Sequence, residues 1–248
     1  MRGVDGLRAA FVGSLLVLAA AAGCADAETR SLDAARRAVR NGDSARAVGF
    51  YQEYLEEHPA DYEVLKEYTL TLGEQWAYAG GDRTPIIELL GRLYELRPSD
   101  QDVQGLLSVM LVREGQAAAE AERFEEAEGV YRRAVAVNPE AGAAQYNLGM
   151  LYDQQGDADQ AFAQYRAAAA KRPQIPDLYL RLGRAYSSRG DFDRAIITLG
   201  LVVELSGVST YLLPEAHCSI AQAYHGKGMA AEATTALERA VDGCELGG

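Results

Sequence analysis

The amino-acid sequence predicts an all-α protein: a solenoid of about six helical hairpins that follows an N-terminal signal segment. The main observation is a motif that returns at a fixed period and consists of a Leu-Gly pair, a tyrosine, a Gly-Asp pair and an alanine. Its first copy contains Leu148, Gly149, Tyr152, Gly156, Asp157 and Ala161, and its second, 34 positions later, contains Leu182, Gly183, Tyr186, Gly190, Asp191 and Ala195. A third copy lies 38 positions further on and contains Ile220, Ala221, Tyr224, Gly228 and Ala233.

Prolines extend this pattern towards the N-terminus. Pro59, Pro98, Pro139 and Pro173 each close a helical segment, and their spacing is close to the period of the motif. A fixed period of this size indicates a repeat architecture. We therefore assign residues 28–248 to a solenoid, whose units are residues 28–61, 62–100, 101–141, 142–175, 176–211 and 212–245.

The first residues predict a signal peptide. Arg2 and Arg8 make the start basic, and an almost entirely apolar run follows over residues 9–22. This run is too short to span a bilayer comfortably, which takes about 20 apolar residues. It has the length of a signal-peptide core, and small residues follow it as at a cleavage site. We expect residues 1–23 to be removed.

The cysteine after this segment predicts a lipid anchor. The Ala-Ala-Gly-Cys sequence that ends at Cys24 resembles the lipobox of bacterial lipoproteins. The resemblance implies that Cys24 is lipidated and that residues 24–27 form a short tether to the solenoid. Ala25 after the cysteine favours the outer membrane over the inner one. The alternative is a plain secretory signal followed by a chance cysteine.

Within each hairpin, the residue types match their expected places. The glycine of the Leu-Gly pair is expected where two helices cross, and the Gly-Asp pair where one helix ends and the next begins. The second and third units should have longer first helices. One should cover residues 62–79, with Thr84 capping the next helix, and the other should run from a Ser99 cap towards Glu120.

The period with its Leu-Gly, Tyr, Ala and Pro pattern resembles the tetratricopeptide repeat. The resemblance implies a right-handed superhelix in which the first helices of successive units line a concave groove that binds protein segments. The glycine of each Leu-Gly pair is then the eighth residue of its unit, and the second, fifth, sixth, ninth and twelfth residues face the groove. The groove residues predicted in this way include Tyr146, Asn147, Met150, Arg181, Arg184 and Gln222.

Two of these residues indicate the chemistry of the partner. Asn147 followed by Arg181 resembles part of the carboxylate clamp of relatives that bind chaperone tails, because Asn can bond a peptide backbone and Arg can grip a carboxylate. The lysine position of that clamp is Asp177 here, which repels a carboxylate. We therefore expect a segment of mixed charge. The alternative is that the arginines are ordinary solvated helix surface.

The other two cysteines predict a structural disulfide. Cys218 lies near the start of the first helix of the last unit, and Cys244 follows its antiparallel second helix. These points lie at the same end of a hairpin, and an exported protein meets oxidising conditions. We expect Cys218 and Cys244 to be bonded. Two buried free thiols are the alternative.

Composition argues against several other functions. The net charge of −12 makes nucleic-acid binding unfavourable, because phosphate contacts need clustered Lys and Arg. The three histidines lack metal-ligand spacing, and no nucleophile elbow, phosphate loop or paired-carboxylate site is recognisable. We expect no enzyme activity, no cofactor and no metal.

The predicted function is a membrane-anchored periplasmic scaffold or assembly factor that binds protein partners of the cell envelope. The layout is similar to that of outer-membrane tetratricopeptide-repeat lipoproteins such as type IV pilus pilotins, without a partner-specific signature. One alternative is an envelope ligand-binding protein or enzyme on a helical-repeat frame, which a deep apolar pocket would favour. Another is a subunit of a larger complex. Oligomeric state is not predicted.

Overall fold

The computed structural model describes residues 30–79, 82–205, 210–240, 244 and 246. Cys24 and the predicted signal segment lie outside these residues. All regular secondary structure in the described ranges is helical, which confirms the predicted all-α class. The described residues divide into two compact units, one ending at Val103 and the other beginning at Gln104.

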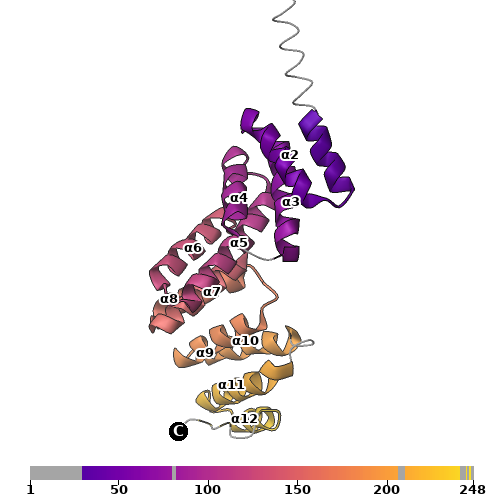
Figure 1. Cartoon of the computed structure of the whole chain (residues 1–248). Helices are drawn as coiled ribbons and strands as arrows, with labels where there is room; N and C mark the ends of the chain where they lie inside the picture. The colour runs from indigo at the N-terminus through magenta and orange to yellow at the C-terminus, as the bar shows by residue number, and fades with distance from the viewer. Residues whose placement is uncertain (1–29, 80–81, 206–209, 241–243, 245, 247–248) are drawn as a thin grey trace, which may run out of the picture. The chain divides into compact units, whose positions relative to one another are not determined.

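The described helices pair into six hairpins, as the repeat pattern predicts (Figure 1). The pairs are residues 30–40 with α2 (Ser44–Glu57), α3 (Tyr62–Ala79) with α4 (Thr84–Leu96), α5 (Gln101–Glu120) with α6 (Phe124–Val137), α7 (Gly142–Gln155) with α8 (Ala158–Ala170), α9 (Pro176–Ser188) with α10 (Phe192–Leu205), and α11 (Leu213–Gly226) with α12 (Ala230–Leu237). A short 3₁₀ helix, η1 (Thr210–Leu212), precedes α11. The helices α3 and α5 are 18 and 20 residues long, whereas α7, α9 and α11 have 13 or 14.

Glycine allows the two helices of a hairpin to cross closely. A Cβ atom on Gly149 would lie 2.6 Å from the ring of Tyr165, and one on Gly183 would lie 2.5 Å from Cγ of Leu199. Gly115 in α5 has the same role, because its Cβ would lie 2.6 Å from the ring of Tyr131. Gly115 also precedes Gly149 by the same interval that separates Gly149 from Gly183. The period therefore extends into the third hairpin, whose first helix carries extra turns at its N-terminal end.

Capping follows the predicted chemistry in the later repeats. Gly156 and Gly190 adopt φ of 79° and 76°, which a glycine tolerates without steric cost. The carboxylate of Asp157 then accepts a hydrogen bond from the backbone N–H of Gln160 (3.1 Å), and Asp191 accepts one from that of Arg194 (3.3 Å). Each Gly-Asp pair thus ends one helix and begins the next.

The caps predicted for α4 and α5 were wrong. Thr84 is the first helical residue of α4, and its backbone N–H donates to the carboxylate of Asp82 (2.9 Å). At the start of α5, Asp100 rather than Ser99 accepts from the N–H groups of Asp102 and Val103 (3.0 and 3.2 Å). An ionised carboxylate accepts stronger hydrogen bonds than a hydroxyl does, and the positive end of the helix dipole favours it further.

The close crossing predicts opposite effects for two glycine-to-alanine substitutions. Gly149→Ala should destabilise the fold by roughly 1–3 kcal/mol, because the new methyl group overlaps the Tyr165 ring. Gly200→Ala, in α10, should stabilise by about 0.5–1 kcal/mol, because a Cβ there meets no atom within 4 Å and the alanine restricts the unfolded chain. The urea midpoints of the two variants measure this, and a shift in the same direction for both would contradict the assigned crossing.

Candidate functional site

Four first helices of the second compact unit present one continuous row of side chains. Gln116 of α5 donates to Asn147 of α7 (3.0 Å), Arg181 of α9 forms an ion pair with Asp153 of α7 (3.6 Å), and Arg184 of α9 donates to Ser219 of α11 (3.1 Å). These contacts place α5, α7, α9 and α11 side by side. We call this row the first-helix face and define it by Gln116, Asn147, Met150, Asp153, Asp177, Arg181, Arg184, Glu215, Ser219 and Gln222.

The amide of Asn147 is used within the chain. Its Nδ2 donates to the carbonyl of Ala143 (2.8 Å), and its Oδ1 accepts from Gln116. Only 9% of the residue is exposed. Asn147 therefore holds α5 against α7, and the polar group turned outward at this point belongs to Gln116.

Arg181 sits in a partly buried network of two carboxylates and two tyrosines. Its guanidinium pairs with Asp177 (2.6 Å) and Asp153 (3.6 Å). Tyr146 donates its hydroxyl to Asp177, and Tyr165 donates to Asp153, both at 2.5 Å. The network links α7, α8 and α9. With two acids facing one arginine, its net charge is negative.

The electrostatics of this network keep both tyrosines neutral. Burial, followed by the hydrogen bond to Asp177, raises the pKa of Tyr146 above its ordinary value. Burial and the bond to Asp153 raise the pKa of Tyr165 in the same way. Burial alone would lower the pKa of Arg181, but the hydrogen bond and attraction to Asp177 outweigh it, so the pKa is raised and the guanidinium stays charged.

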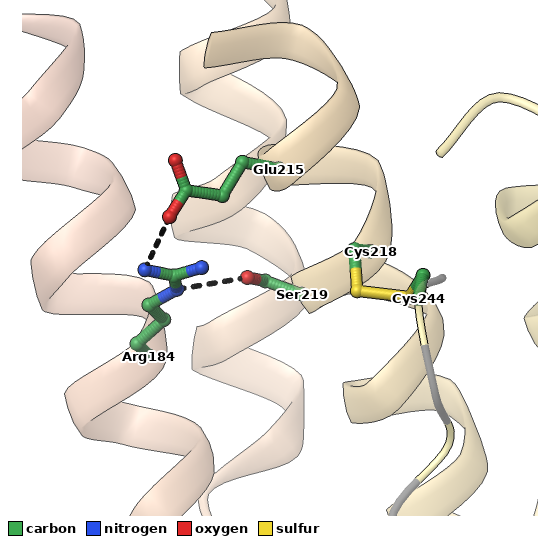
Figure 2. Close-up of a disulfide and its surroundings, with 5 residues drawn as sticks. All are labelled: Arg184, Glu215, Cys218, Ser219 and Cys244. Carbon is green, nitrogen blue, oxygen red and sulfur yellow. Dashed lines mark hydrogen bonds and ion pairs between the residues drawn. A yellow bond between two sulfur atoms is a disulfide. The ribbon is translucent and has the colours of Figure 1, made fainter. Parts of the chain in front are cut away.

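Arg184 is also paired, as Figure 2 shows. It reaches from α9 to α11, where it forms an ion pair with Glu215 (2.6 Å) and donates to Ser219 (3.1 Å). Gln222 lies on α11 close to Ser219 in sequence and is exposed. Five of the six predicted groove residues belong to the first-helix face, and Tyr146 contacts it through the hydrogen bond to Asp177. Arg181 and Arg184 already hold carboxylates of the chain itself.

A hollow opens in the first-helix face beside Met150. Its volume is about 350 Å³, and its lining is Gln116, Ala119, Glu120, Tyr131, Asn147, Met150, Leu151 and Gln154. Gln116 and Glu120 were not among the predicted groove residues. The spacing indicates Gln116, because Gly115 lies one period before Gly149 and gives Gln116 the repeat position of Met150 and Arg184.

The first compact unit has a similar hollow of about 380 Å³ between the helix over residues 30–40 and α3. Arg36 pairs there with both carboxylate oxygens of Glu67 (2.8 and 3.0 Å). Tyr51 also donates to Glu67 (3.0 Å). The hydrogen bond from Arg36 is the main cause that lowers the pKa of Glu67. Here too the arginine holds two helices together.

Neither a metal centre nor a membrane span is found in the described part of the chain. No three His, Cys, Asp or Glu side chains gather there in a way that could hold a metal ion. None of the helices described is both long enough and apolar enough to cross a membrane.

A disulfide joins the ends of the last hairpin. Cys218 of α11 and Cys244 after α12 are bonded, with their Cα atoms 5.7 Å apart and a sequence separation of 26. Figure 2 shows that Cys218 points away from Arg184, on the other side of α11. The bond therefore ties the C-terminal segment to α11 without entering the row of polar contacts on the first-helix face.

Family comparisons agree with this architecture. Three family models, each described as tetratricopeptide repeat, match residues 112–176, 154–205 and 214–242. This chain is a tetratricopeptide-repeat protein. Stacked repeats of this kind form extended surfaces that bind other proteins, and the fold is that of a protein-interaction scaffold. No curated protein sequence matches the chain.

Several solved structures are similar in fold. The crystal structure of MamA protein is 24% identical, with 72% of this chain and 91% of that chain covered and a TM-score of 0.45. YrrB, described as a TPR protein with an unusual peptide-binding site, is 17% identical, with 77% and 91% covered and a TM-score of 0.49. The first TPR of Spaghetti (RPAP3), solved with an HSP90 peptide, is 17% identical, with 49% and 93% covered and a TM-score of 0.42.

The disulfide should stabilise the last hairpin specifically. Closing a loop of this size stabilises by about 3 kcal/mol. Replacing both Cys218 and Cys244 by Ser should therefore speed hydrogen exchange in α11 and α12 and leave α7 and α8 almost unchanged. A reductant should reproduce the effect in the native chain and have none on the double variant. Identical melting of the oxidised and reduced chain would contradict a structural role.

Proposed function

We propose that this protein is a lipid-anchored scaffold of the bacterial cell envelope that binds a segment of a partner protein on its first-helix face. The observation that carries the proposal is the continuous row of side chains across α5, α7, α9 and α11 with a hollow at Met150. A rigid row of polar groups beside a recess with a mixed polar and apolar lining suits an extended segment, which can place one side chain in the recess. The role is binding, without catalysis.

The charges on the face define the partner further. Arg181 and Arg184 are neutralised by Asp153, Asp177 and Glu215, so a free carboxylate gains little by docking there. Glu120, at the rim of the hollow, adds a further negative charge. The face therefore suits a segment of mixed charge, with an apolar side chain for the hollow and a basic group next to it.

Two features support an envelope location with a membrane anchor. The first is the signal-like start that ends in Ala-Ala-Gly-Cys at Cys24. The second is the disulfide between Cys218 and Cys244, since disulfides persist in oxidising compartments such as the bacterial periplasm. Ala25 after the cysteine favours the outer membrane.

A charge introduced into the hollow should abolish partner binding. Met150→Lys places an ammonium group where we expect an apolar side chain, and the partner recovered by crosslinked pull-down from native membranes should fall about tenfold or more. Ile197→Lys is the matched control, because Ile197 lies on the second helix α10 and is 70% exposed. Circular dichroism and melting show whether each variant is folded. Equal recovery of the same partners with both variants would overturn the first-helix face as the binding site.

Arginine reversal is a poorer test of the same face. Arg181→Glu would set a third carboxylate beside Asp153 and Asp177, so loss of binding would follow from damaged packing of α7 against α9. Met150→Lys leaves these ion pairs in place.

The anchor is tested separately at Cys24. Cys24→Ser should prevent incorporation of labelled fatty acid and move the protein from the membrane to the soluble fraction, because acyl chains contribute about 0.8 kcal/mol per buried methylene group. Ala25→Ser, next to the lipidation site, is the control and should remain in the membrane fraction. Unchanged fatty-acid labelling of Cys24→Ser would refute lipidation at this residue.

A further inference from the structure

A third and larger hollow lies in the second compact unit, between α8 and α10 with part of α9. Its volume is about 590 Å³, within the range of ligand pockets. Its apolar lining includes Tyr179, Leu182, Tyr186, Leu201 and Leu205. We call it the junction pocket, because it lies where the fourth hairpin meets the fifth.

The junction between the third and fourth hairpins, one period earlier, has an ion pair at the corresponding positions. There Lys171 forms an ion pair with Glu140 (2.7 Å). The residues one period later are Leu205 and Gln174, which cannot form that pair, and both line the junction pocket. At the junction pocket, an apolar side chain and a neutral amide thus stand in place of the two charged residues of the earlier ion pair.

Another difference between the two junctions leaves an arginine without an acidic partner. At the earlier junction Arg132 pairs with Glu128 (2.7 Å) and donates to the hydroxyl of Tyr152 (3.2 Å). One period later the arginine is kept as Arg166, but Phe162 stands at the position of Glu128. The guanidinium of Arg166 lies over the Phe162 ring, 5.6 Å from its centre, at the rim of the pocket.

A second arginine faces the same pocket. Arg172 follows α8 with φ of 50°, a conformation that costs free energy for any residue with a Cβ. Arg172 and Tyr179 both line the pocket. Burial raises the pKa of Tyr179, and the charge of Arg172 opposes that rise. Neither Arg166 nor Arg172 forms an ion pair among the described residues, and Glu204 is the acidic residue in the lining.

We propose that the junction pocket binds an acidic segment of a partner protein, which inserts an aromatic or large aliphatic side chain and sets neighbouring carboxylates against Arg166 and Arg172. Charge complementarity identifies this occupant. In a chain of net charge −12, the rim of an apolar recess carries two arginines that lack acidic partners among the described residues. Guanidinium groups bind carboxylates through paired hydrogen bonds, and the recess supplies the apolar contact. This surface is separate from the first-helix face.

The experiment measures fluorescence anisotropy of labelled, terminally blocked peptides with the full chain in phospholipid nanodiscs. The probes are hexapeptides with a Phe-Asp-Asp core, an Ala-Asp-Asp core or a Phe-Lys-Lys core. The first should bind about tenfold or more tightly than the other two. Replacing both Arg166 and Arg172 by Glu should weaken its binding about tenfold or more. The charge-matched control replaces the exposed Arg37 and Arg133 by Glu and should stay within about twofold.

Several results would overturn the junction pocket as an acidic-segment site. They are equal binding of the Phe-Lys-Lys peptide, unchanged binding by the Arg166 and Arg172 variant, and no binding of the Phe-Asp-Asp peptide at millimolar concentration. Binding of dodecanoate but not of the peptide would assign the pocket to lipid and also reject the proposal. Met150→Lys should leave the peptide affinity unchanged, so the outcome is independent of the first-helix face. Melting curves verify that each variant is folded.

Discussion

In the fourth hairpin, the close crossing of two helices at Gly149 positions the polar groups that hold this hairpin to the next one. In the fourth hairpin the ring of Tyr165 lies against Gly149, and its hydroxyl then reaches Asp153, one turn further along α7. Asp153 in turn holds Arg181 on α9. A larger residue at Gly149 would displace the ring and with it the hydroxyl. Close backbone contact inside one hairpin therefore fixes the polar link to the next hairpin.

The fifth hairpin shows what happens when this sequence of contacts is interrupted. One period after Tyr165 the chain has Leu199, which packs against Gly183 but carries no hydroxyl, and one period after Asp153 it has Ser187. The hydroxyl of Ser187 is buried without a hydrogen-bond partner. The link to the last hairpin runs instead through Arg184, which reaches Glu215 and Ser219. Leu199 thus keeps the packing role of Tyr165, and Arg184 provides the polar link to the next hairpin.

Periodicity made the hairpins and the shared face predictable, because both depend on spacing along the chain. Gly115 was not predicted as a crossing glycine, because the third unit was recognised by its proline. The extra turns of α5 precede Gly115 and leave the period intact. The pairing of side chains was not predictable in the same way. Asn147 bonds Gln116, 31 residues away, and Arg184 bonds Ser219, 35 residues away. Such partners are set by the angle between hairpins, which spacing alone does not give.

Arginine therefore has two different roles in one repeat array. Arg181 and Arg184 pair with an acid on a neighbouring helix, and Arg132 pairs with an acid one turn earlier on its own helix. In each case the charge of the guanidinium is cancelled. Phe162 stands one period after Glu128 and cannot pair with an arginine. The charge of Arg166 therefore remains available beside an apolar surface. A repeat protein is stabilised by the contacts between its neighbouring units, to which these ion pairs belong. Binding sites for acidic segments are consequently expected at the junctions where internal pairing has been given up, and the polar row of the first helices should select partners of a different charge.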